Sequence, residues 1–179
     1  MKLLIVSYHF YPALIPPAIR WKALGEHWTR LGHEVRVVSG WAPGLPREER
    51  VGGMRVRRVG GLFRETLRGW LRGPNGAGEG RGGPSSWLKR LHDATWKRVY
   101  WPDFASLWSI PAFREARRLM REGCDALVTV SHPFTPHLVG LALKRASPAV
   151  PWVADMGDPF CLLEDASLNN LALYRSLAR

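Results

Sequence analysis

The sequence predicts an α/β protein built on a Rossmann-like, doubly wound parallel sheet. Short apolar runs that end in turn-prone residues alternate with longer segments in which apolar residues recur at helical spacing. Runs that are apolar at nearly every position are typical of strands buried on both faces, as in parallel sheets. The 179 residues are 46% hydrophobic and 23% charged, so the chain can bury a core and is not disordered as a whole.

The first part of the chain predicts a strand, a helix and two further strands. After a loop over residues 8–17, apolar residues at helical spacing predict a helix from Ala18, with Pro17 suited to the first helical position. Gly32 is expected to stop this helix. The strands predicted here are residues 2–7, 34–39 and, more exposed, 54–59.

The second part continues the alternation. The helices predicted here are residues 87–99, 111–122 and 136–145, and the strands are residues 126–131 and 151–154. We expect one Rossmann-like domain over residues 1–165, interrupted by a glycine-rich, basic and mobile loop over residues 60–86. Residues 166–179 are expected to form a C-terminal helical segment.

The charge is strongly basic and regional. The chain carries 26 Lys and Arg against 15 Asp and Glu, a net charge of +11, and residues 47–98 hold 13 of these basic residues against five acidic ones. Tryptophans occur in and just beyond this stretch, at Trp70, Trp87, Trp96 and Trp101. A solvated face and a surface for anionic lipid headgroups both remain open as interpretations. Nucleic acid is disfavoured, because no recognition motif accompanies the charge.

Several functional classes are excluded by missing patterns. The loop after the first strand contains no glycine, so it is no dinucleotide fingerprint, and the chain has neither a P-loop, a G-x-S-x-G elbow nor an H-E-x-x-H motif. Cys124 and Cys161 form no C-x-x-C pair, which argues against a disulfide scaffold or zinc ribbon. No apolar run is long enough to span a membrane and no export signal is evident, so a cytoplasmic protein is expected.

The candidate site lies where parallel strands end. In an open parallel sheet, ligands bind beyond the carboxyl ends of the strands, here the loops 7–17, 131–136 and 155–160. The start of the first helix, at Pro17 and Ala18, is expected to favour an anionic group. The polar residues expected near these ends are His9, Arg20, Ser131, His132, His137, Asp155 and Asp158.

Each of these residues also has a structural interpretation. His132 is either an ordinary loop histidine or a group that contacts a sugar, and Arg20 is either a surface residue or a binder of an anion. Asp158 is as compatible with capping the backbone as with accepting hydrogen bonds from sugar hydroxyls. The spacing of His132 and His137 argues against a shared metal, and no metal or cofactor is expected.

Five segments in order resemble the N-terminal domain of family 4 glycosyltransferases. The resemblance covers nearly the whole chain except about residues 60–86. The segments are LLIVSYHFYP from Leu3, AIRW from Ala18, LGHEVRVVS from Leu31, WPD from Trp101 with IPAFREARRL from Ile110, and CDALVTVSHPFTPHLVG from Cys124 with VPWVADMGDPF from Val150.

The resemblance implies the N-terminal half of a GT-B architecture, in which this domain binds the acceptor and a second domain binds a nucleotide sugar. Such enzymes retain the anomeric configuration and need no metal. The second domain, with its Glu-x7-Glu motif, has no room in 179 residues, so the fragment alone is expected to be inactive. Pro16, Pro17 and Ala18 stand where the family often has phosphate-facing glycines, and Ser131 or, preferably, His132 takes the place of a histidine that contacts the reacting sugar.

The function expected from this resemblance is sugar transfer from a nucleotide-sugar co-substrate to a glycan or lipid-linked acceptor in cell-envelope or surface glycan synthesis. The protein would then be cytoplasmic, and peripheral on the inner face of the membrane if residues 47–98 meet an anionic surface. The alternative is a stand-alone basic module that binds anionic membrane or nucleic acid without catalysis.

Overall fold

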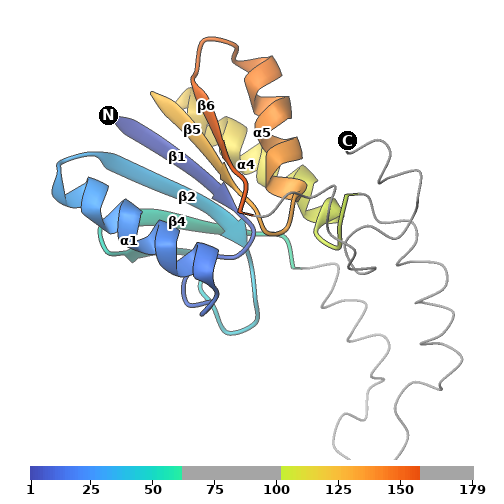
Figure 1. Cartoon of the computed structure of the whole chain (residues 1–179), viewed down its shortest axis with the longest axis horizontal. Helices are drawn as coiled ribbons and strands as arrows, with labels where there is room; N and C mark the ends of the chain where they lie inside the picture. The colour runs from blue at the N-terminus through green and yellow to red at the C-terminus, as the bar shows by residue number, and fades with distance from the viewer. Residues whose placement is uncertain (62–101, 158–179) are drawn as a thin grey trace, which may run out of the picture.

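The fold is α/β, with a six-stranded, mostly parallel sheet flanked by helices. A computed structural model describes residues 1–61 and 102–157 (Figure 1). The predicted helix 87–99, the glycine-rich loop from residue 62 onward, Asp158 and the C-terminal segment 166–179 lie outside the described residues.

The described elements follow the predicted order. The strands are β1 (Lys2–Ser7), β2 (Glu34–Gly40), β3 (Glu48–Val51), β4 (Met54–Val59), β5 (Ala126–Val130) and β6 (Trp152–Asp155). The helices are α1 (Pro16–Arg30), a 3₁₀ turn over Ser106–Trp108, α4 (Ser109–Arg121) and α5 (Thr135–Ala146). The Rossmann-like prediction is therefore confirmed for this part of the chain.

The sheet order is β3-β4-β2-β1-β5-β6. From β1 the chain moves outward through β2 to β4, and later returns to add β5 and β6 on the other side of β1. The order therefore reverses between β1 and β5, whose carboxyl ends lie side by side, with Ser7 paired to Val130. Such a reversal is where open α/β sheets bind ligands.

Two apolar layers hold the helices to the sheet. On one face, Trp21 of α1 packs with alternate residues of the central strands, including Ile5 and Val37. On the other face, α4 and α5 pack on the intervening residues, among them Leu4 and Val6 (Figure 1). Residues 3–6 are apolar without interruption because both faces of β1 are covered in this way.

The sequence prediction missed β3. This short strand pairs antiparallel with β4 across the two-residue turn Gly52–Gly53, where both glycines have positive φ values of 54° and 87°. A Gly-Gly pair between two polar-apolar segments is a hairpin signal. The segment alternates too weakly over four residues to be recognised as a strand alone, and pairing with β4 supplies its stability.

Candidate functional site

The loop after β1 is held rigidly beside the end of β2. The Ser7 hydroxyl donates to the His9 carbonyl at 2.7 Å, and the Gly40 N–H donates to the Tyr8 carbonyl at 2.9 Å. A Cβ on Gly40 would lie 2.9 Å from that same carbonyl oxygen, so glycine is required for this approach. Arg58, 3% exposed, donates to the Tyr11 carbonyl at 2.7 Å. These contacts fix the backbone that carries His9.

Two histidines follow the neighbouring strands β1 and β5, on either side of the reversal of strand order. His9 follows β1 and His132 follows β5, and both are half-buried. Burial, and secondarily repulsion from His132, lowers the pKa of His9 below its usual value. His9 is therefore a neutral imidazole at pH 7, able to donate one hydrogen bond and accept another. Aromatic rings line its surroundings, with Tyr8 edge-on at 4.9 Å and Phe104 at 6.2 Å between ring centroids.

Ser131 ties the end of β5 to the end of β6. Its backbone N–H and its hydroxyl both donate to the Asp155 carbonyl at 3.1 Å, and the Gly157 N–H donates to its hydroxyl oxygen at 3.1 Å. The side chain thus has a bonded structural role in this structure. The family resemblance left Ser131 and His132 as alternatives for the residue that contacts the sugar. The His132 side chain takes no part in these bonds between β5 and β6.

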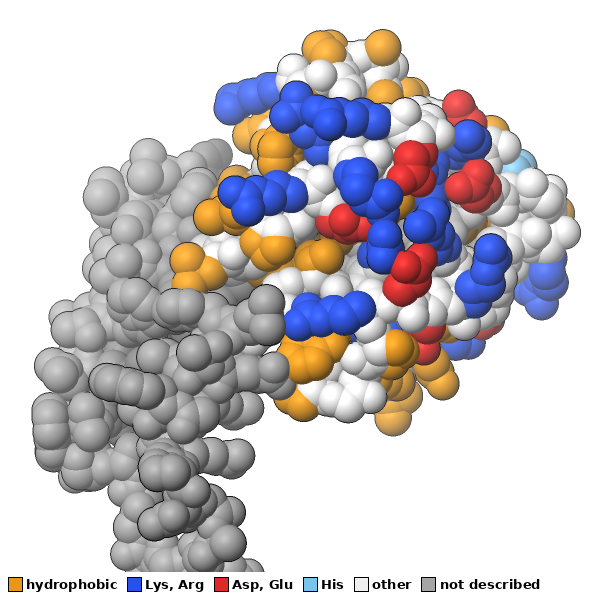
Figure 2. Space-filling model, turned by 180° about the vertical axis from the view of Figure 1, so that it is seen from behind, with side chains coloured by type: hydrophobic (Ala, Val, Ile, Leu, Met, Phe, Trp, Pro, Cys, Tyr) orange, Lys and Arg blue, Asp and Glu red, His pale blue; other side chains and the backbone are white. Residues whose placement is uncertain are grey.

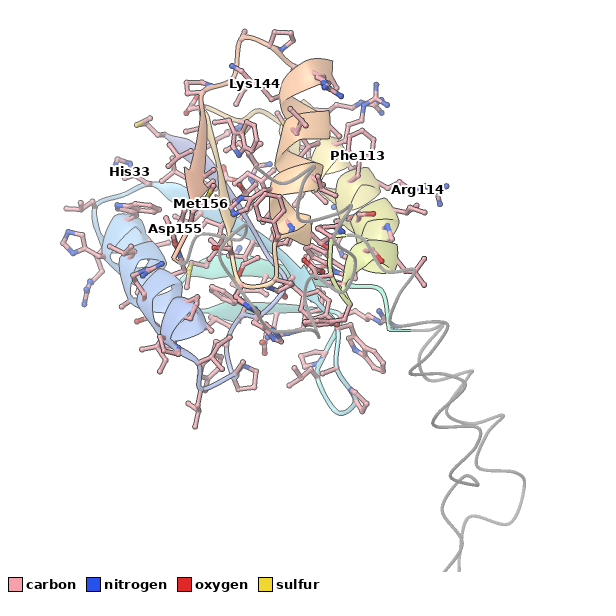
Figure 3. The ribbon with its side chains drawn as sticks, turned by 45° about the vertical axis from the view of Figure 1, so that its right-hand side comes forward. His33, Phe113, Arg114, Lys144, Asp155 and Met156 are labelled. Carbon is pink, nitrogen blue, oxygen red and sulfur yellow. The ribbon has the colours of Figure 1, made fainter. Side chains whose placement is uncertain are left out.

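Arg20 lies at the candidate site, where it is paired with a carboxylate. Its guanidinium forms an ion pair with Asp155, and the Trp21 indole N–H donates to the same carboxylate oxygen at 2.6 Å. Figure 3 shows Asp155, the last residue of β6, and Met156, which follows it, on the side of β6 that faces α1. An incoming anion would have to share Arg20 with Asp155, whose side chain is 24% exposed. The sequence prediction placed both residues at these ends without foreseeing that they pair.

The start of α1 offers less to an anion than the sequence led us to expect. Pro16 and Pro17 open the helix, and proline has no N–H group. Of the first three helical residues only Ala18, 1% exposed, retains a backbone donor. The positive end of the helix dipole remains, so any attraction there is mainly electrostatic.

The N–H groups at the start of α5 are bound by an aspartate that the sequence prediction did not include in the site. Asp103, 1% exposed, accepts hydrogen bonds from the Phe134 and Thr135 N–H groups at 2.7 and 2.9 Å. It also accepts from the Thr135 hydroxyl at 2.7 Å and from the Ala105 N–H at 2.9 Å. The Ala105 bond is a local Asx turn that a sequence can suggest, but the contact across 31 residues to Phe134 is a product of the fold. Asp103 thereby fixes the backbone directly after His132 and Pro133.

His137 lies in the buried layer behind this site. The Trp152 indole donates to the Thr129 hydroxyl oxygen at 2.9 Å, and that hydroxyl lies 2.8 Å from His137 Nδ1. His137 is 4% exposed, and its Nε2 has no hydrogen-bond partner within residues 1–61 and 102–157. Burial lowers the pKa of His137 to about 4, against smaller opposing effects of Asp155 and Asp103. The histidine is a neutral packing residue joining α5 to β5 and β6.

The structure describes the first part of the basic stretch. Over residues 47–61, the arginines of β4 are bound to carboxylates: Arg55 and Arg57 to Glu48, at 2.9 and 2.5 Å, and Arg58 to Glu49. Arg57 also reaches Glu115 of α4 at 3.0 Å. The arginines of β4 thus form a paired network, whereas Arg47 lies over the Trp41 ring, with its guanidinium carbon 4.1 Å from the ring centroid. Its remaining residues lie outside the described ranges.

Within residues 1–61 and 102–157, no group of three or more His, Cys, Asp or Glu side chains is arranged to hold a metal ion. No helix in the described ranges is both long and apolar enough to cross a bilayer.

No known family model matches this chain, and no curated protein matches it either. Among solved structures, it is similar to the C-terminal domain of a hydrogenase from Pyrococcus furiosus, with 15% identity and a TM-score of 0.41. The match covers 87% of this chain and 91% of that one. A likeness this weak says nothing about the site.

Proposed function

We propose that this chain is the N-terminal, acceptor-binding domain of a retaining, metal-independent glycosyltransferase that uses a nucleotide-sugar donor. The observation that carries the proposal is the meeting of His9 and His132 at the carboxyl ends of β1 and β5, where the strand order reverses. The ordered sequence segments that resemble family 4 glycosyltransferases give the reaction class.

In this proposal the histidine pair binds the sugar that reacts. A neutral imidazole at His9 can accept a hydrogen bond from a sugar hydroxyl, because its lowered pKa keeps it unprotonated at pH 7. His132, on the adjacent loop, contacts the reacting sugar from the other side of the reversal. Aromatic rings around His9 exclude water, which would otherwise compete as the acceptor.

The Arg20–Asp155 pair offers both signs of charge at the same edge. Asp155 can accept hydrogen bonds from acceptor hydroxyl groups, and Arg20 can attract the departing nucleotide diphosphate. Groups that meet charge as it develops in the transition state contribute the largest share of catalysis in many enzymes. A second domain would supply the nucleotide-binding groups, including a Glu-x7-Glu motif, and close over the site.

The test uses the natural polypeptide that contains this chain, incubated with labelled nucleotide sugars and a lipid and glycan extract as acceptor. We expect transfer with retained configuration, lowered at least about 100-fold by His132→Ala, a loss typical of one removed transition-state contact. His33→Ala is the matched control, since His33 lies at the opposite end of the sheet, before β2. Equal activity of the His132 and His33 variants would refute the role of His132.

The division of labour between two domains has its own test. The isolated 179-residue chain should transfer little or no sugar, because it lacks the donor-binding half. Robust transfer by the isolated chain would contradict the proposal. Saturable binding of anionic ligands with no transfer by the natural polypeptide would instead favour the alternative, a basic binding module.

The proposed location is the cytoplasmic side of the cell membrane, where nucleotide sugars and lipid-linked acceptors meet. This location follows from the reaction class. The sequence prediction that residues 47–98 approach an anionic membrane stays a prediction for residues 62–98.

A further inference from the structure

The outer face of α4, continued by the 3₁₀ turn before it, carries a line of exposed side chains. Five residues that recur every three or four positions face solvent there: Leu107, Ile110, Arg114, Arg117 and Arg121. Leu107 and Ile110 are 51% and 55% exposed. We call these five residues the α4 stripe. Figure 3 shows Arg114 projecting away from the helix.

The arginines of the α4 stripe have no carboxylate partner among the described residues. In the described part of the chain, Arg114, Arg117 and Arg121 form no salt bridge, whereas Arg118, on the adjacent side of α4, binds both Glu115 and Glu122 at 2.7 and 2.6 Å. The guanidinium carbon of Arg117 lies 5.9 Å from the centroid of the Phe113 ring. Among the described residues, α4 thus pairs Arg118, whose side chain is 42% exposed, and leaves the three arginines of the α4 stripe without a salt bridge.

Figure 2 shows the contrast on the face where α4 lies. Basic and acidic side chains are mixed near the middle of the view, while toward its upper left the basic side chains stand among hydrophobic ones with few acidic side chains between them. In this view, the basic side chains that stand apart from acidic ones lie among hydrophobic groups.

The direction of α4 places the two parts of the α4 stripe at opposite ends of the domain. Trp108 contacts Tyr8, beyond the carboxyl end of β1, with 5.3 Å between ring centroids, so Leu107 and Ile110 lie at the site end. Gly123, just after α4, lies against Lys2 at the start of β1, so Arg121 lies at the opposite end. The aliphatic side chains are next to the candidate site, and the arginines extend away from it.

We propose that the α4 stripe docks this protein on an anionic phospholipid bilayer. The unpaired arginines meet lipid phosphates, and Leu107 and Ile110 enter the boundary between headgroups and acyl chains. A nucleic acid would satisfy the arginines but would leave two half-exposed aliphatic side chains in water, which favours the bilayer. Docking through the whole α4 stripe lays α4 along the lipid surface, with Leu107 and Ile110 in the lipid at the end nearest the candidate site. This proposal does not depend on the reaction proposed above.

The experiment measures cosedimentation of the 179-residue chain with vesicles of phosphatidylcholine and 30 mol% phosphatidylglycerol at two salt concentrations. Each arginine near an anionic surface contributes about fivefold in affinity, so Arg114→Gln with Arg121→Gln should weaken binding about 25-fold. The matched control is Arg30→Gln with Arg50→Gln, two exposed arginines on α1 and β3 that give the same net charge. The control variant should bind as the unmodified chain does.

A second variant separates the bilayer from other polyanions. Ile110→Ser should weaken vesicle binding about fivefold, since a half-exposed aliphatic side chain no longer enters the lipid, and should leave binding to a single-stranded oligonucleotide unchanged. Circular dichroism of each variant checks that the fold is retained. Equal loss in the two arginine pairs, tighter binding to the oligonucleotide than to vesicles, or no salt-sensitive vesicle binding would each overturn the proposal.

Discussion

Asp103 gives the sharpest prediction about what organises the site. Replacing it with alanine removes the acceptor for three backbone N–H groups and one hydroxyl, all at 2.7–2.9 Å. Hydrogen bonds to a charged acceptor contribute about 1.5–3 kcal/mol each, and bonds that share one carboxylate are not additive. We expect Asp103→Ala to lower the free energy of unfolding by about 4 kcal/mol, at the upper end for a single substitution.

The assay is urea denaturation followed by circular dichroism, with two comparison variants. Asp103→Asn keeps an oxygen for the Phe134 and Thr135 N–H groups, so about 2 kcal/mol of loss is expected. Asp125→Ala is the matched control, because the exposed Asp125 accepts a bond from the Lys2 N–H at 2.6 Å. Its loss should be about 1 kcal/mol or less. A loss below about 1 kcal/mol for Asp103→Ala would refute the argument that this carboxylate closes α5 and fixes the loop after His132.

Three further predictions concern buried and titrating groups. The pKa of His137 is about 4 in the folded protein, so between about pH 6.5 and pH 4 the unfolded chain binds a proton at this histidine that the folded protein does not. The free energy of unfolding should therefore fall by about 3 kcal/mol as the pH is lowered through this window. In urea titrations, His137→Gln should reduce this pH dependence. Gly140→Ala should lower the free energy of unfolding by about 1–3 kcal/mol in the same assay, since its Cβ would lie 2.6 Å from a Thr129 methyl carbon. Gly157→Ala should leave the free energy of unfolding unchanged within error, since no described atom lies within 4 Å of the added Cβ. His132→Gln should raise the pKa of His9 in an NMR titration, because it removes the electrostatic effect of His132 that lowers this pKa. An unchanged or lower pKa would show that the two rings are not coupled.

The fold was predictable because its signals are local. Continuous apolar runs such as residues 3–6 report burial on both faces, and Gly32, with a φ of 83°, ends α1 as expected. The start of α4 was placed two residues late, since Ser109 precedes the Pro111 that marks it. The strand β3 was missed because its stability comes from β4 rather than from its own four residues.

The site was only partly predictable, because its contacts join residues far apart in the chain. Because His9, Ser131 and His132 follow predicted strands, the sequence correctly placed them at one end of the sheet. No local pattern shows that Arg20 pairs with Asp155, 135 residues away, or that Asp103 reaches Thr135, 32 residues away. Net charge likewise cannot show which arginines are free, since the arginines of β4 are paired by neighbouring strands and α4.

The central claim is that this domain forms the acceptor side of a sugar-transfer site with His132 at its centre. The most direct measurement is the rate of sugar transfer from labelled nucleotide donors by the natural polypeptide, compared between the unmodified protein and its His132→Ala and His33→Ala variants. We predict transfer that His132→Ala lowers at least about 100-fold and His33→Ala leaves unchanged. Transfer that survives His132→Ala, or no transfer from any nucleotide sugar to the lipid and glycan extract, would contradict this account.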